Sequence, residues 1–144
     1  MMRLHSVKSC LTALTIVVAI GSAATARSAN LNDPEPSLWR CELSQEQVLQ
    51  GITAGLIGRG WSVIENDGEG NLVAQIIVRA KHTLIVDIAY DDQSFDINYK
   101  DSDNLEYRIR RNGTANIHRN ANSWMNNIQM DITAQLLALC ALNR

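Results

Sequence analysis

The amino-acid sequence has little of what membrane-spanning and metal-binding proteins require. It contains no stretch of about 20 consecutive apolar residues, the length with which a helix crosses a bilayer. Cys41 and Cys140 are far apart in the sequence and no paired Cys/His spacing accompanies them, so structural zinc is not indicated. Internal repeats and low-complexity segments are also missing. These absences predict a small domain with no stable membrane anchor and no cofactor.

Residues 1–26 have the three-part pattern of a secretory signal peptide. A basic start precedes the apolar run Leu11–Ile20, and small residues follow it. Ala24 and Ala26 occupy the two positions that a signal peptidase reads, so we expect cleavage after Ala26. A membrane anchor is the alternative, but this run is too short to span a bilayer. The pattern therefore predicts an exported protein, periplasmic or secreted.

Removing the predicted signal peptide leaves 118 residues (144 − 26), which is room for one domain with one core. It also removes Arg3 and Lys8, so 11 basic residues (13 − 2) remain against 15 acidic ones, a net charge near −4. That balance argues against nucleic-acid binding, which needs a basic surface. Residues 27–37 hold both prolines and no apolar periodicity, so we predict a flexible leader there and a single α+β domain over 38–144.

Two cysteines, Cys41 and Cys140, remain after cleavage. In an oxidising compartment such a pair is expected to form a disulfide. The bond would join the start of the domain to its end, and closing a loop of about 100 residues is worth roughly 4–5 kcal/mol in the chain-entropy treatment. Two buried free thiols are the alternative.

Period-two alternation of apolar residues dominates the middle of the chain. It is typical of an antiparallel sheet that is covered on one face only. Short connections separate the alternating runs, and such connections permit only antiparallel neighbours. We therefore predict a four-stranded antiparallel meander, with strands at residues 61–66, 72–80, 83–90 and 94–100.

Helical periodicity flanks the predicted strands. Ser44 and Gln47 fit a capping box, and apolar residues recur after them at helical spacing. Gly51 and Gly55 lie four residues apart in this helix, which we interpret as an allowance for close packing on the sheet. From about residue 120 a longer amphipathic helix follows. The predicted fold class is α+β, with an N-terminal and a long C-terminal helix packed on one face of the meander.

The segment 101–117 shows no sustained periodicity. Asn112-Gly113 is a favoured two-residue hairpin turn, so 107–111 and 114–117 would form a small ribbon around it. An irregular loop is the alternative.

Two motifs stand out, YKDSDNLEY at residues 99–107 and IHRNANSW at residues 117–124. Together with Gly60-Trp61 before the first predicted strand, they resemble a family of small exported bacterial proteins, many of them lipoproteins, with no established activity. The resemblance covers about residues 43–137. The chain departs from the family at Ala121, where relatives tend to have tyrosine, and it has no lipobox cysteine. The resemblance implies a fold and an envelope location, and no reaction.

Asp101, Asp103 and Glu106 place three carboxylates in one short segment. Hard cations such as Ca²⁺ take oxygen ligands of this kind, but the glycine and the distant glutamate of an EF-hand loop are missing. A solvated turn is the alternative. His118 with Asp101 or Asp103 would make an acid–base pair. The alternative for His118 is a residue that caps the helix after it.

Four arginines follow the acidic strands: Arg108, Arg110, Arg111 and Arg119. A basic loop beside an aromatic residue can bind an anionic group or an acidic partner. Alternatively, these arginines pair with carboxylates of the same molecule, which contributes little stability.

The second face of the predicted sheet is partly apolar, because Ile77 and Ile85 fall on it. Without a helix over them, they form an apolar strip that suits another envelope protein or a second copy of this chain as a homodimer. A helix over part of that face, or simple exposure, is the alternative. The leading hypothesis is a non-enzymatic binding or structural module of the bacterial cell envelope, acting through this sheet face and the arginine loop. The alternative function is a small periplasmic enzyme or ligand carrier that uses His118 with nearby acids.

Overall fold

The predicted strands form one antiparallel sheet in the computed structural model, which describes residues 27–143. The predicted signal peptide, residues 1–26, lies outside the described residues. Four strands follow one another as a meander: β3 (Ser62–Asn66), β4 (Asn71–Val78), β5 (His82–Tyr90) and β6 (Ser94–Asp103). β2 (Ser37–Leu38) pairs with the free edge of β6 and completes the order β2-β6-β5-β4-β3. The meander is present as predicted, but the prediction of a four-stranded sheet was incomplete.

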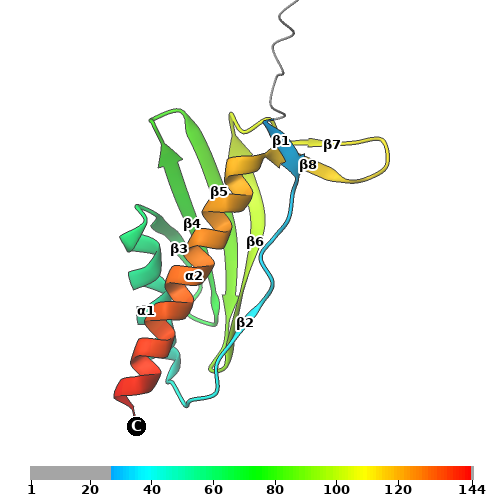
Figure 1. Cartoon of the computed structure of the whole chain (residues 1–144). Coiled ribbons are helices and arrows are strands. Elements are labelled where there is room, and N and C mark those ends of the chain that lie inside the picture. Colours follow the sequence, from blue (N-terminus) through cyan, green and yellow to red (C-terminus); the bar gives the residue numbers. More distant parts are fainter. Residues whose placement is uncertain (1–26, 144) are drawn as a thin grey trace, which may run out of the picture.

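Both helices lie on one face of this sheet (Figure 1). α1 (Gln45–Gly58) begins with the predicted capping box, in which Gln47 N donates to Ser44 Oγ at 3.2 Å and Ser44 N donates to Gln47 Oε1 at 2.9 Å. α2 (Arg119–Leu142) runs diagonally across the strands. The α+β fold class is therefore confirmed.

Side-chain alternation decides which face of the sheet the helices cover. Leu84, Val86 and Ile88 of β5 are fully buried, whereas the residues between them are only partly buried. The buried set joins the apolar stripes of α1 and α2 in one hydrophobic cluster. Removing this apolar surface from water is the main force that holds the helices on the sheet.

Gly51 and Gly55 bring the two helices together, not a helix and the sheet. A β-carbon at position 51 would lie 2.6 Å from Leu136 Cδ2, and one at position 55 would lie 2.8 Å from Ile132 Cα. At position 51 the Leu136 side chain would have to move, whereas at position 55 the obstacle is the backbone of α2, so the close contact requires glycine at position 55. The interpretation that they pack on the sheet was wrong.

A second, three-stranded sheet stands at one end of the molecule. It contains β1 (Ser28–Asn30), β8 (Ala115–His118) and β7 (Arg108–Ile109) in the order β1-β8-β7. The β7–β8 hairpin turns at Asn112-Gly113, where Thr114 N donates to Asn112 Oδ1 at 3.1 Å. Of the two alternatives for the segment 101–117, the ribbon is therefore the correct one.

β1 and the first residue of β2, Ser37, lie in the segment for which the sequence suggested a flexible leader. β1 pairs with β8, and farther along the segment Asp33 Oδ1 accepts a hydrogen bond from Tyr99 N at 2.7 Å. Pro34 is buried. Strands of two or three residues are too short to show a period in the sequence. Pairing with distant strands fixes their conformation, so the sequence pattern did not reveal them.

Cys41 and Cys140 form the predicted disulfide, with their Cα atoms 5.6 Å apart. The bond joins the segment before α1 to the last turns of α2. The alternative of two free thiols was wrong. Within residues 27–143, no helix has both the length and the apolar composition needed to cross a membrane.

Candidate functional site

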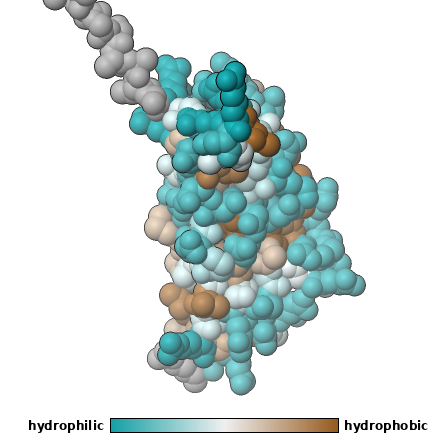
Figure 2. All heavy atoms as spheres, turned by 90° about the vertical axis from the view of Figure 1, so that its right-hand side faces the viewer, coloured by the Kyte–Doolittle hydropathy of each residue, from teal (hydrophilic) through white to brown (hydrophobic). Residues whose placement is uncertain are grey.

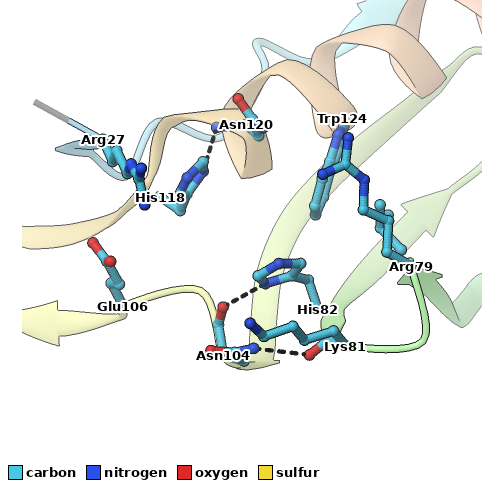
Figure 3. A pocket seen from close by; sticks show the side chains of 10 residues that line it. Arg27, Arg79, Lys81, His82, Asn104, Glu106, His118, Asn120 and Trp124 are labelled. Carbon is cyan, nitrogen blue, oxygen red and sulfur yellow. Dashed lines mark hydrogen bonds between the residues drawn. The ribbon is translucent and has the colours of Figure 1, made fainter. Parts of the chain in front are cut away.

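A pocket of about 580 Å³ opens where the β4–β5 turn faces the start of α2 (Figure 3). Its size falls within the range of small-molecule sites, about 300–1,000 Å³. The side chains that line it come from the segment before β1, the β4–β5 turn, the β6–β7 connection and the β8–α2 junction. The pocket is thus assembled from parts of the chain that are far apart in the sequence.

Cationic side chains outnumber carboxylates around this pocket. Arg27, Arg79 and Lys81 line it, and Glu106 is the one carboxylate that does so. The ion pairs found within residues 27–143 lie elsewhere in the molecule. Three cations therefore face the pocket without an acidic partner, although the whole chain has a formal net charge of −2.

His82 is held in a fixed orientation at the pocket (Figure 3). Its Nδ1 lies 2.7 Å from the carbonyl oxygen of Asn104. Since a carbonyl can only accept, this geometry assigns the proton to Nδ1. Asn104 Nδ2 donates in turn to the carbonyl oxygen of Lys81 at 3.2 Å. These bonds tie the β4–β5 turn to the segment after β6 and leave His82 Nε2 available to a ligand.

His118 caps α2. Its Nδ1 accepts a hydrogen bond from Asn120 N at 3.3 Å, which requires an Nδ1 without a proton. With Nδ1 as the acceptor, the ring carries its hydrogen on Nε2, which is a donor on a residue that lines the pocket. Of the two alternatives for His118, the helix cap is the one that the structure contains.

Backbone strain is concentrated around the pocket. Within residues 27–143 the non-glycine residues with positive φ are Arg79 (55°), Ala80 (50°), Asn104 (56°) and Glu106 (56°). Three of these four line the pocket. A left-handed conformation costs a residue with a β-carbon roughly 1–2 kcal/mol. Such strain persists where the surrounding structure fixes it, and it gathers at binding sites.

Trp124 supplies an aromatic wall on the α2 side of the pocket. Its indole is half-buried, and Figure 3 shows the side chain of Arg79 reaching toward it. A cation and an aromatic ring that line the same pocket suit a ligand that has both a charged group and an apolar part.

The three carboxylates predicted as ligand or metal candidates do not lie together. Asp101 pairs with Ile85 and Asp103 with Thr83, which places both acids on the face without helices, whereas Glu106 lines the pocket. Neither Asp101 nor Asp103 lines the pocket with His118, so the structure does not form the predicted acid–base pair. In residues 27–143, no three His, Cys, Asp or Glu side chains gather so that they could hold a metal ion.

A stacked pair of tyrosines holds the chain next to Glu106. The rings of Tyr99 and Tyr107 are 4.7 Å apart between centroids, and the hydroxyl of Tyr99 lies 2.9 Å from Ser102 Oγ. Burial raises the pKa of Tyr99, and the hydrogen bond with Ser102 opposes this rise. The stack fixes the connection from β6 to β7, from which Glu106 reaches the pocket.

The predicted arginine loop is the β7–β8 hairpin. Arg108, Arg110 and Arg111 are exposed on it, and Arg119 is the first residue of α2. In the part of the chain that the structure describes, none of the four forms an ion pair, so the alternative of pairing within the molecule was wrong. The backbone N of Arg119 donates to the carbonyl oxygen of Arg27 at 2.8 Å and thereby positions that residue at the pocket.

Ile77 and Ile85 lie on the sheet face that carries no helix, as predicted. Ile77 is 57% exposed, and Ile85 is partly buried.

Figure 2 shows the side of the molecule with the β7–β8 hairpin, where the surface is mostly hydrophilic and its hydrophobic patches are small and separate. No large apolar patch dominates that side.

Comparison with known proteins gives no relative for this chain. No protein-family model, no curated protein and no solved structure matches it. The resemblance carried by the two sequence motifs therefore stays a prediction.

Sequence reasoning missed the cationic half of the pocket. Arg79, Lys81 and His82 fall within four consecutive residues, and this cluster is the local cue to it in the sequence. Arg27 and Trp124 join them only because β1 pairs with β8 and α2 begins directly after β8. No pattern along the sequence encodes that arrangement.

Proposed function

We propose that this protein is a non-enzymatic binding module of the bacterial cell envelope that holds a small organic anion in the pocket between the β4–β5 turn and α2. The observation that carries the proposal is the excess of unpaired cations. Arg27, Arg79 and Lys81 face the pocket, and Glu106 is the one carboxylate there. An anion would replace the water around these cations with charge-assisted hydrogen bonds.

The two histidines add directed donors and acceptors to this positive field. His118 offers its Nε2–H, and His82 keeps its Nε2 free because Nδ1 is used by Asn104. Trp124 gives the apolar part of a ligand a surface to lie on. The ligand that this set favours is a carboxylate or phosphate ester with a small apolar or sugar-like body.

Ligand binding is better supported than catalysis. Each histidine ring forms its hydrogen bond with a backbone group, not with a carboxylate. A general acid–base pair needs a second ionisable group that orients or tunes the first. The proposed role is therefore the ligand-carrier half of the earlier alternative, with Arg79 and Lys81 in place of Asp101 and Asp103.

The envelope location rests on the predicted signal peptide, and the disulfide Cys41–Cys140 supports it because such bonds persist in oxidising compartments. In that setting the pocket would meet metabolites that have crossed an outer barrier or have been released from the envelope.

Calorimetric titration of the purified protein with citrate and with glucose 6-phosphate tests the proposal, with glucose as the uncharged control. We expect saturable binding of at least one of the two anions and none of glucose. Arg79→Gln should weaken that binding roughly ten- to hundredfold, since a hydrogen bond to a charged group is worth about 1.5–3 kcal/mol.

The matched control is Arg40→Gln, which removes the same charge from an exposed position that does not line the pocket. It should leave the dissociation constant unchanged. Equal weakening by both variants would show general charge attraction, and the absence of saturable binding by either anion would refute the pocket proposal.

A further inference from the structure

The β7–β8 hairpin carries a concentration of unpaired positive charge. Arg108, Arg110 and Arg111 are exposed on it and form no ion pair within residues 27–143. Between them Ile109 is 67% exposed. Figure 1 shows that the hairpin extends sideways from the rest of the molecule. The hairpin therefore presents one exposed apolar side chain together with three cations.

The helix-free face of the five-stranded sheet has the opposite charge. On β5 and β6 the residues that alternate with the buried core include Asp87, Asp96, Asp101 and Asp103. Lys100 is the basic residue among them, and its Nζ is already bound to Asp87 Oδ1 at 2.7 Å. This face therefore has an excess of carboxylates that no cation of the described residues neutralises.

Apolar side chains lie next to these acids. Ile77 on β4 is opposite Thr83, and Ile85 on β5 is opposite Asp101. Ile77 is 57% exposed. The sheet face thus presents an apolar strip with carboxylates, and the β7–β8 hairpin presents an exposed isoleucine with three arginines. The two surfaces have opposite charge, and both include exposed apolar side chains, as the two sides of a protein interface do.

We propose that two copies of this chain associate, with the β7–β8 hairpin of each lying on the helix-free sheet face of the other. In a two-fold dimer the hairpin of each copy contacts the sheet face of the other copy. Both complementary surfaces of both copies are then occupied, so the assembly closes at a dimer. None of the hairpin arginines or sheet acids lines the anion pocket, so this inference is independent of the proposed function.

The dimer should be weak and sensitive to salt. Exposed ion pairs contribute only about 0–1 kcal/mol each, and salt screens them. Sedimentation velocity in low-salt buffer should show a species with twice the monomer mass, and this species should dissociate as the salt concentration rises. A wild-type chain that stays monomeric in low salt at millimolar concentration would overturn the proposal.

Exchange of charge between the two surfaces gives the decisive test. Arg110→Glu with Arg111→Glu should abolish the dimer, and so should Asp101→Arg with Asp103→Arg. An equimolar mixture of the two double variants should restore it, because each reversed surface then faces its complement. Persistence of the dimer in either double variant alone, or a mixture that stays monomeric, would contradict the assigned surfaces.

Ile109→Ser guards against a folding artefact. The side chain is mostly exposed, so circular dichroism should show an unchanged fold while the dimer dissociation constant rises several-fold. Arg40→Glu, a reversal at an exposed site outside both surfaces, should leave the dimer intact. A dimer indifferent to Ile109→Ser, or lost in Arg40→Glu, would argue against the hairpin contact.

Discussion

Gly55 of α1 lies so close to Ile132 of α2 that a β-carbon at position 55 would be 2.8 Å from both the backbone N and the Cα of Ile132. The obstacle is backbone, which cannot rotate away as a side chain can. We therefore expect Gly55→Ala to push the two helices apart and to lower the free energy of unfolding by about 1–3 kcal/mol, the usual cost of overpacking.

Gly58→Ala is the matched control for this variant. It makes the same substitution at the last residue of α1, where a β-carbon would meet nothing within 4 Å. Alanine has the higher helix propensity, so this variant should be neutral or more stable by up to about 1 kcal/mol. Urea denaturation measures both. Equal effects at positions 55 and 58 would contradict the close helix contact.

Replacing both disulfide cysteines, Cys41→Ala with Cys140→Ala, should lower the free energy of unfolding by about 4–5 kcal/mol, because the bond closes a long loop in the unfolded chain. The two residues are 99 positions apart. Reduction of the wild-type protein should produce the same loss. Chemical denaturation with and without reductant provides the measurement, and an unchanged midpoint would show that the bond does not stabilise the fold.

Ala80→Gly should stabilise the protein by about 1 kcal/mol, because glycine adopts positive φ without the penalty that alanine pays. Arg79 and Ala80 both have positive φ in the turn in which Lys81 N donates to Val78 O at 3.2 Å. The variant keeps the Arg79 side chain, so anion affinity should not change. A thermal melt and a titration check the two parts, and a lower melting temperature would show that this turn is not strained.

Stability should fall in acid through Asp67. Hydrogen bonds from Asn71, led by that of its side-chain amide at 2.8 Å, lower the pKa of the Asp67 carboxyl in the folded protein. A lowered folded pKa means that this stabilisation is fully present above the unfolded value of about 4 and is lost as the pH falls through the lower folded value.

Melting temperature as a function of pH measures this contribution. Asp67→Asn should flatten the acid limb of the profile compared with wild type. Asp92→Asn, in an exposed turn and without a hydrogen bond in the described part of the chain, is the control and should leave the limb as it is. A profile with the same acid limb in wild type and Asp67→Asn would refute the role of this carboxylate.

The sequence predicted the four meander strands and the start of α1, because short-range patterns of apolar and capping residues define them. The alternation through Leu84, Val86 and Ile88 located the sheet and its buried face, and Ser44 with Gln47 located the start of α1. In each case the residues that define the element are neighbours in the sequence, and their burial follows from a period of two or of 3.6.

The features that the sequence did not predict depend on contacts between segments that are far apart in the sequence. β1 exists because it pairs with β8, and neither strand is long enough to show a period. The partner of Gly55 proved to be α2 because helix packing, not the sequence spacing of the glycines, decides which backbone comes close. Asp101 and His118 were grouped by their nearness in sequence, but Asp101 lies opposite Ile85 on the helix-free sheet face and His118 caps α2.

The most direct test of the anion pocket is a nuclear magnetic resonance titration of the isotopically labelled protein with citrate. The pocket account predicts saturable shifts of the amide signals of Arg79 and His82, of the His118 ring and of the Trp124 indole N–H, with little change on the β7–β8 hairpin. Shifts confined to Arg108, Arg110 and Arg111, or no saturable shifts at all, would contradict it.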